Sequence, residues 1–239
     1  MTIDSKPLDG RLALVTGASR GIGAATAEVL AKAGAHVILT ARKGAGLEEV
    51  EERIHAAGGS ATIAPMDLTE GESIGKLATA VAERWGKLDV LVLNAAMLGA
   101  LTPVQDIDAK EFARLVSLNL LANQALIAAF DPLLRKADKA DIVALTSSVG
   151  SEPRAFWGAY GSSKAALETL IGAYADETAF TGKMRVHIVD PGATRTRMRQ
   201  LAFPGEDPET LKPPEAVAEA ILARRLSDAP TGETLRVAT

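Results

Sequence analysis

Short runs rich in Val, Ile and Leu alternate with stretches of helical periodicity along almost the whole chain. The runs are near-continuous in apolar character, which is typical of strands buried on both faces of a sheet. The stretches between them have apolar residues at 3.6-like spacing and often end at glycine. This succession predicts βαβ units and a parallel sheet with right-handed crossovers. The predicted strands are RLALVTG (11–17), AHVILTA (35–41), ATIAPMD (61–67), LDVLVLNA (88–95), DIVALTSS (141–148), MRVHIVDPG (184–192) and ETLRVA (233–238).

The composition is that of one globular domain. The 239 residues are 47% apolar, enough for a sizeable core, and no linker, low-complexity tract or repeat divides them, so we predict a single domain over 1–239. The net charge of −4 without a basic stripe argues against nucleic acid as a partner. The absence of cysteine excludes disulfides, thiolate nucleophiles and zinc–cysteine sites. The three histidines show no metal-ligand spacing, so we predict no metal.

Two further observations bear on location. The first residues, MTIDSKPLDGR, lack the apolar region of a secretory signal. No continuous apolar run reaches the ~18 residues of a membrane span. We therefore expect a cytoplasmic protein without a membrane partner.

The segment TGASRGIG (16–23) joins the first predicted strand to the first predicted helix. Gly17, Gly21 and Gly23 have the spacing G-x-x-x-G-x-G. Glycine allows a tight turn and the approach of a phosphate to the amides of a helix N-terminus. Ligands of open parallel sheets bind beyond the carboxyl ends of the strands. The segment therefore predicts a nucleotide-phosphate site, with a flexible turn as the alternative.

The second predicted strand ends in basic residues. An Asp or Glu there would bind the ribose 2′-hydroxyl of NAD. This chain has Arg42 and Lys43 instead, and Arg20 lies in the glycine loop. Because cations pair with a 2′-phosphate through charge-assisted hydrogen bonds, the pattern favours NADP over NAD. Solvated surface cations are the alternative explanation.

Tyr160 and Lys164 lie four positions apart in AYGSSKAAL. On a helix these positions share one face, so the phenol and the ammonium reach into one site. Taken alone, the pair also fits an ordinary amphipathic helix. Hydride transfer to a carbonyl needs a proton donor, and a nearby cation lowers the pKa of a phenol from its usual value of about 10. If the site transfers a hydride, Tyr160 is the expected general acid, with its pKa lowered by Lys164.

Several motifs agree in order and spacing, and from about Leu8 to Val237 the chain resembles the short-chain dehydrogenase/reductase family. TGASRGIG is similar to its T-G-x-x-x-G-x-G cofactor loop, and Ser147, Tyr160 and Lys164 resemble its Ser…Tyr-x-x-x-Lys core. The resemblance implies an α/β fold with a Rossmann-like doubly wound parallel sheet of about seven strands, in the order 3-2-1-4-5-6-7, with helices on both faces. It also implies NADP(H)-dependent hydride transfer between a nicotinamide and a carbonyl or secondary alcohol.

The resemblance implies a role for individual residues. Tyr160 is the general acid/base, Lys164 holds the nicotinamide ribose, Ser147 polarises the substrate carbonyl, and Asn119 holds a water that relays protons to Lys164. Asp67 and Leu68 end the third predicted strand, where the family's acidic residue contacts adenine. The implied cofactor-binding residues are Gly17, Ser19, Arg20, Gly21, Ile22, Gly23, Arg42, Asp67, Leu68, Asn94, Ala95, Tyr160, Lys164, Pro191, Gly192, Thr194 and Thr196.

The chain departs from the family pattern at two places. The family's N-N-A-G element reads L-N-A-A here, with Leu93 and Ala96 replacing Asn and Gly. The segment TSSVG offers two serines: an alignment without gaps selects Ser147, 13 positions before Tyr160, and Ser148 requires a gap on each side. Ser147 is favoured and Ser148 stays open.

Residues 193–214 correspond to the family's variable substrate lid, which is expected as an insertion in the single domain. The resemblance implies a small carbonyl or alcohol as substrate, but the sequence does not choose among ketones, sugars, steroids and acyl thioesters. It also implies a homodimer or homotetramer formed through helices expected at 108–136 and 160–180. Apolar residues expected to line a pocket, or else to pack, are Met198, Leu201, Phe203, Phe156 and Trp157.

Three other functions share some of these sequence features. A non-catalytic NADP-binding regulator fits the same fold, but it would not require Ser147, Tyr160 and Lys164 together. A methyltransferase also has a glycine-rich loop after its first strand, but it gives Tyr160 and Lys164 no role. An epimerase would need a larger substrate region than the few dozen residues after Gly192.

Overall fold

A computed structural model describes residues 6–238, so residues 1–5 and 239 of the predicted domain lie outside the described part. Seven strands form one sheet in the order β3-β2-β1-β4-β5-β6-β7. Every neighbouring pair is parallel, which confirms the predicted doubly wound topology. The strands are β1 (Leu12–Thr16), β2 (His36–Thr40), β3 (Ser60–Ile63), β4 (Val90–Leu93), β5 (Ala140–Leu145), β6 (Met184–Asp190) and β7 (Thr234–Arg236).

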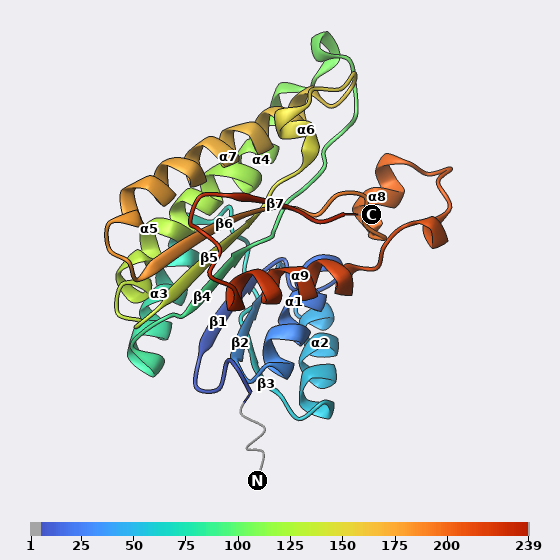
Figure 1. Ribbon diagram of the computed structural model, residues 1–239. Coiled ribbons are helices and arrows are strands. Elements are labelled where there is room, and N and C mark those ends of the chain that lie inside the picture. Colours follow the sequence, from blue (N-terminus) through green and yellow to red (C-terminus); the bar gives the residue numbers. More distant parts are fainter. Residues whose placement is uncertain (1–5, 239) are drawn as a thin grey trace.

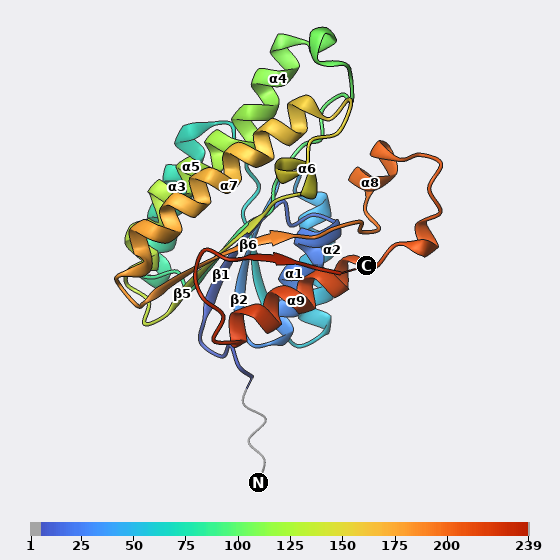
Figure 2. The same cartoon turned by 45° about the horizontal axis from the view of Figure 1, so that its top comes forward.

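Helices cover both faces of the sheet, as Figures 1 and 2 show. One layer contains α1 (Gly21–Lys32), α2 (Ala45–Ala56) and α9 (Pro214–Leu226). The opposite layer contains α3 (Gly71–Trp85), α4 (Ala109–Val116), α5 (Ala122–Leu134) and α7 (Gly158–Ala179). The remaining helices are short: α6 (Ser148–Ser151), α8 (Arg197–Ala202), and the 3₁₀ turns η1 (Val104–Asp106) and η3 (Pro208–Thr210).

The two layers explain why the strands are apolar without alternation. Successive side chains of a strand point to opposite faces. In β1, Leu12 and Leu14 belong to the core beneath α3 and α5, whereas Ala13 and Val15 belong to the core beneath α1 and α9. Both sets are buried, so each residue of the strand must be apolar.

Every predicted strand range is longer than the strand in the structure, and we describe the third and the seventh. The third ends at Ile63 rather than at residue 67. The chain still follows β2, since Ala64 N and Met66 N donate to Leu39 O and Ala41 O. Asp67 therefore lies beyond the strand and not at its end. The seventh is confined to Thr234–Arg236 instead of 233–238.

The helix expected over 108–136 is interrupted. A π-helical segment, η2 (Ser117–Leu121), lies between α4 and α5 and holds Asn119. Together the three pieces form a 26-residue helix, Ala109–Leu134, which is the one helix among the described residues that is long and apolar enough to span a membrane. Its apolar residues Leu126 and Phe130 pack in the core against the sheet.

Candidate active site

The glycine loop is tightly fitted between β1 and α1. Gly17 and Gly21 have φ of 66° and 57°, in the left-handed region that favours glycine. A Cβ atom on Gly23 would lie 2.3 Å from Gly17 O and 2.4 Å from Asn94 Nδ2, so no side chain fits there. The first turn of α1 has no side-chain cap, and its N–H groups are free to bind a phosphate.

Thr16 and Asn94 join this loop to the end of β4. Thr16 Oγ1 donates to Val92 O (3.0 Å) and accepts from the backbone N of Asn94 (2.9 Å) and of Ala95 (3.0 Å). Asn94 Nδ2 donates in turn to Thr16 O (2.8 Å) and Gly17 O (3.3 Å). The asparagine and alanine predicted to bind the cofactor thus lie directly against the glycine loop.

Basic residues lie where the adenosine ribose is expected. Arg20, Arg42 and Lys43 are exposed after β1 and β2. Asp67 lies close enough to Arg42 that this guanidinium helps to lower the pKa of its carboxyl, although the hydrogen bonds from Thr69 contribute more. The side chain of Leu68 is buried in the core, so its backbone is the part that a cofactor could contact.

Tyr160 and Lys164 share one face of α7, as the spacing predicted. They are 7% and 3% exposed, and Lys164 Nζ lies 5.8 Å from the centroid of the tyrosine ring. Lys164 Nζ donates to Leu145 O at the end of β5 (2.7 Å). The pair therefore lies at the carboxyl edge of the sheet, where ligands of such folds bind.

The predicted pKa of Tyr160 is wrong for the protein by itself. Burial raises the pKa of the phenol, and the carboxylate of Asp190 raises it further. Burial also lowers the pKa of Lys164 to about 8, although the carboxylate of Glu168 acts in the opposite direction. Both groups are thus shifted toward their neutral forms by loss of water, which the sequence spacing does not reveal.

Asn119 is completely buried and anchors three segments. Its Oδ1 accepts from Met97 N (2.9 Å), and its Nδ2 donates to Met97 O (2.9 Å) and Ser163 Oγ (3.1 Å). Ser163 Oγ donates to Tyr160 O (2.7 Å), which links the asparagine to the tyrosine's backbone. The carbonyl of Asn119 accepts from Asn123 Nδ2 (2.8 Å). Sequence reasoning missed Ser163 and Asn123, although the second lies one helical turn after Asn119.

The two candidate serines lie at the start of α6. Ser147 is the extended residue before the helix, with φ −162°, and Ser148 is its first residue. The carbonyl of Ser148 accepts from Glu152 N (2.8 Å). The preceding Thr146 donates its hydroxyl to the carboxylate of Glu168 on α7, a contact that sequence reasoning also missed. Both serines are partly exposed, so the choice between them still rests on the alignment that favours Ser147.

The segment after β6 returns to the glycine loop. Asp190 Oδ1 accepts from Gly192 N (3.0 Å), and Thr194 Oγ1 donates to Pro191 O (3.0 Å). Thr196 caps α8 by accepting from Arg199 N (3.1 Å). A Cβ on Gly21 would lie 3.5 Å from Thr196 Cγ2, so the start of the predicted lid lies beside the glycine loop.

An aromatic stack joins the predicted lid to the tyrosine. Trp157 packs edge-on against Tyr160 (5.9 Å between centroids) and stacks on Phe203 (5.7 Å). The guanidinium of Arg199 covers Phe203 at 3.8 Å and pairs with Glu206 at 2.6 Å. Of the other apolar residues expected near a pocket, Leu201 lines the cavity described next, and Phe156 is 56% exposed with φ of 72°.

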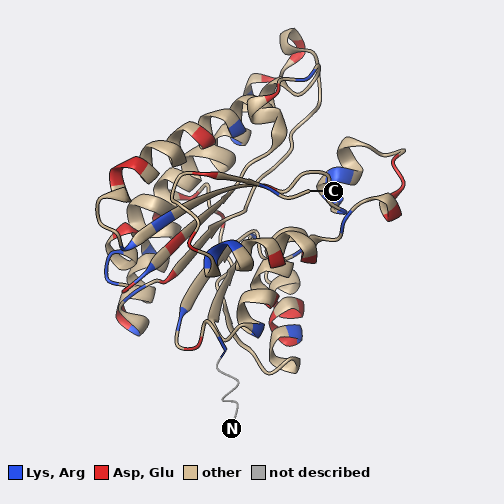
Figure 3. Ribbon diagram, in the orientation of Figure 1, with Lys and Arg blue, Asp and Glu red and all other residues tan. Residues whose placement is uncertain are grey.

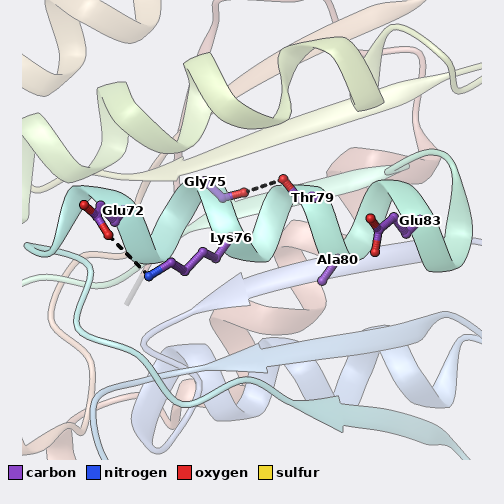
Figure 4. Close-up of a pocket in the computed structure, with 6 residues that line it drawn as sticks. All are labelled: Glu72, Gly75, Lys76, Thr79, Ala80 and Glu83. Atoms are coloured by element: carbon purple, nitrogen blue, oxygen red, sulfur yellow. Dashed lines mark hydrogen bonds and ion pairs between the residues drawn. The ribbon is translucent and has the colours of Figure 1, made fainter.

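An open cavity of about 610 Å³ lies between the segment after β4 and α8. A second depression of about 600 Å³ follows the outer face of α3 (Figure 4). Two of its charged residues, Lys76 and Glu72, are paired at 3.3 Å, and it is formed by a single helix. The first cavity is therefore the candidate substrate site. Its lining is Met97, Leu98, Gly99, Ala100, Leu101, Glu111, Leu201 and Ala202.

A parallel sheet with a glycine-lined turn after β1 and a buried Tyr–Lys pair at its carboxyl edge defines a nucleotide-binding α/β protein. The family model described as short chain dehydrogenase matches residues 11–207. YciK of Escherichia coli strain K12, named an uncharacterized oxidoreductase, is 38% identical over 210 residues, which cover 87% of this chain and 82% of YciK.

Two solved structures are similar over nearly their full lengths. A short chain dehydrogenase from Shigella flexneri 2a strain 301, complexed with NADP, has 36% identity and a TM-score of 0.93 over 98% of this chain and 99% of that one. Another from Escherichia coli CFT073, complexed with NADPH, has 36% identity and a TM-score of 0.93 over 99% and 100%. The chain belongs to the short chain dehydrogenase family and is an NAD(P)-dependent oxidoreductase acting on CH–OH and C=O groups.

Proposed function

We propose that this protein is an NADP(H)-dependent oxidoreductase that interconverts a carbonyl compound and a secondary alcohol, with Tyr160 as general acid/base. The observation that carries the proposal is the buried Tyr160–Lys164 pair at the carboxyl edge of the sheet, beside an uncapped helix N-terminus. Groups with strongly shifted pKa values that lie near a nucleotide site are candidates for proton transfer.

The residues of the glycine loop and the strand ends fit NADP. The free N–H groups at the start of α1 suit the diphosphate, and Arg20 and Arg42 suit the 2′-phosphate. Two similar structures contain NADP or NADPH. When bound, the cofactor supplies the hydride. Residues proposed to hold it are Gly17, Ser19, Arg20, Gly21, Ile22, Gly23, Arg42, Asp67, Leu68, Asn94, Ala95, Pro191, Gly192, Thr194 and Thr196, with Tyr160 and Lys164.

The proton reaches the product oxygen from the phenol of Tyr160. Because burial and Asp190 raise the pKa of this phenol, it carries its proton at neutral pH and is ready to donate in the reductive direction. Lys164, with a pKa of about 8, is mostly charged at neutral pH and favours the phenolate that remains. Ser147 donates to the same carbonyl oxygen. Asn119 fixes α7 through its hydrogen bond to Ser163, and it holds the water that relays protons to Lys164.

The substrate is proposed to be a largely apolar carbonyl compound. Apolar side chains from Met97 to Leu101 and from α8 surround most of the candidate cavity, and the Trp157–Phe203 stack holds α8 beside Tyr160. The lid 193–214, a cytoplasmic location and a homo-oligomeric state are further parts of the proposal, supported by the family resemblance.

The test is NADPH oxidation, recorded at 340 nm against aldehydes, ketones, diketones and 3-ketoacyl thioesters, with NADH in parallel. We expect turnover with NADPH, much slower turnover with NADH, and faster rates for apolar ketones. Faster turnover with NADH would overturn the cofactor assignment while keeping the oxidoreductase. Tight NADPH binding without turnover of any carbonyl would instead favour the non-catalytic regulator.

A further inference from the structure

Glu168 extends the functional face of α7 by one turn. Tyr160, Lys164 and Glu168 follow one another at intervals of four residues, so their side chains lie along one line of the helix. The line points toward the end of β5. Lys164 Nζ donates to the carbonyl of Leu145, and the carboxylate of Glu168 accepts the hydroxyl of the next residue, Thr146.

The contact with Thr146 lies directly before the candidate serine. Thr146 is 3% exposed, so its hydroxyl depends on a protein partner. Ser147 follows it directly in the chain, so the position of Thr146 helps to determine the position of the serine backbone. A Cβ atom on Gly150 would lie 3.1 Å from Glu168 Oε1 and 3.1 Å from Ala165 N, so a glycine on α6 leaves room for the carboxylate.

We propose that Glu168 is a positioning residue for this reaction. Its carboxylate holds Thr146, and through it the segment that carries Ser147, against the helix that carries Tyr160 and Lys164. The inference rests on the proposed function, because it assigns no new step and determines only how well the serine, the tyrosine and the lysine are aligned. A negative charge one turn from Lys164 also favours the ammonium form of that buried side chain.

Few charged groups face this line from the elements around it. The carboxylate of Glu168 raises the pKa of Lys164, and the carboxylate of Asp190 at the end of β6 raises the pKa of Tyr160. The segments η2 and α6 contain no titratable side chain. On α4, Glu111 is bound to Ala100 N (2.9 Å), whereas Lys110 and Arg114 are exposed. The charge of Glu168 is thus the negative charge on α7 with the most direct effect on Lys164.

The test uses Glu168→Ala, Glu168→Gln and Thr146→Val in the full chain, with the exposed Asp176→Asn on the same helix as control. We expect Glu168→Ala and Thr146→Val each to lower kcat about 10-fold, with no further loss in the double variant, because both remove one interaction. Glu168→Gln keeps an oxygen that accepts from Thr146, so it should restore kcat to within about 2-fold. Asp176→Asn should change neither kcat nor KM.

A second readout separates positioning from simple stability. The pH dependence of NADPH binding is followed by the fluorescence of NADPH. In Glu168→Gln the loss of binding at high pH should move to lower pH by ~0.5–1 pH unit, since the uncharged amide no longer favours the ammonium of Lys164. Asp176→Asn should leave the profile unchanged.

The results that overturn the proposal are distinct from those that overturn the function. Wild-type kcat in Glu168→Ala, or an unmoved binding profile in Glu168→Gln, would refute the role of Glu168 even if the enzyme reduces carbonyls. A lower melting temperature with normal kcat would make the contact purely structural. If the wild-type protein reduces no carbonyl, the proposed function fails, and an unmoved NADPH-binding profile would refute the role of Glu168 independently.

Discussion

Buried ionisable groups lie at both edges of the sheet, but their partners differ: those at the amino edge have direct partners of opposite charge, and the Tyr160–Lys164 pair at the carboxyl edge has none among the described residues. At the amino edge, Asp141 on β5 is fully buried and faces Arg185 Nη2 (2.8 Å), His187 Nε2 (2.9 Å) and Arg225 Nε (3.3 Å). At the carboxyl edge, the buried Lys164 donates to a neutral carbonyl and Tyr160 lies beside it.

The difference separates structure from chemistry. A buried carboxylate surrounded by guanidinium groups joins the elements that carry these side chains. A buried lysine without a direct carboxylate partner has a displaced pKa and can respond to a ligand. Figure 3 shows charged residues of both signs spread over the helices. Lys164 and Asp141 are both buried. The predictions below test this division, from the largest expected effect to the smallest.

The sharpest test compares the two tyrosines of α7. Tyr160→Phe should lower kcat by ~10³-fold or more, because the proton donor is lost, while NADPH binding and the free energy of unfolding change little. Tyr174 is the matched control, since its hydroxyl donates to Asp131 Oδ1 (2.7 Å) far from the glycine loop. Tyr174→Phe should keep kcat and lose ~1 kcal/mol of stability. Normal turnover in Tyr160→Phe would show that the buried groups at the carboxyl edge have a structural role, as those at the amino edge do.

The amino edge should give the reverse result. Asp141→Ala leaves Arg185 and Arg225 buried without their carboxylate, which should lower the free energy of unfolding by ~3–5 kcal/mol. Urea titration measures this, and kcat per folded molecule should stay normal. Asp141→Asn keeps the hydrogen-bonding oxygen and provides a folded variant if the alanine does not fold. Glu152→Ala removes the exposed pair with Arg236 (3.6 Å) and should change stability by less than about 1 kcal/mol.

Lys164 should leave a signature in stability against pH. Its pKa is about 8 in the folded protein and ordinarily about 10.5, so the unfolded chain binds more protons between these values. Stability should therefore rise with pH in this window, by about 2 kcal/mol between pH 8 and 10. Lys164→Met should lose that rise when urea titrations of the two proteins are compared at both pH values. Parallel curves for the two proteins would show that the lysine is not desolvated.

The smallest effect is expected at the exposed rim of the carboxyl edge. Arg42→Ala should weaken NADPH binding about 10-fold and leave NADH binding nearly unchanged, because only NADPH carries the 2′-phosphate. Titration of both cofactors by fluorescence measures this. Lys110→Ala, on the exposed side of α4, is the control. Equal losses for both cofactors would mean that Arg42 does not recognise the 2′-phosphate.

Much of this architecture can be predicted from the chain alone. The strand runs are recognisable because both faces of the sheet are covered, and the glycine spacing is recognisable because Gly23 has no room for a side chain. The end of β3 at Ile63 is not recognisable, because the chain continues beside β2 as far as Met66. The raised pKa of Tyr160 and the contact between Thr146 and Glu168 depend on burial and on residues 22 positions apart, which no local pattern encodes.

The π-helical segment η2 inserts one extra residue into the helix from Ala109 to Leu134. An unbroken α-helix of the same length in space would have one residue fewer. Each residue of an α-helix turns it by about 100°, so removing one residue here would rotate α4 by that angle about α5. Leu115 would then leave the buried face on which it packs, and Asn119 would no longer point at Met97. The π-helical segment therefore rotates the two halves of the helix relative to each other. As a result, the second half faces the sheet and the first half faces the substrate cavity.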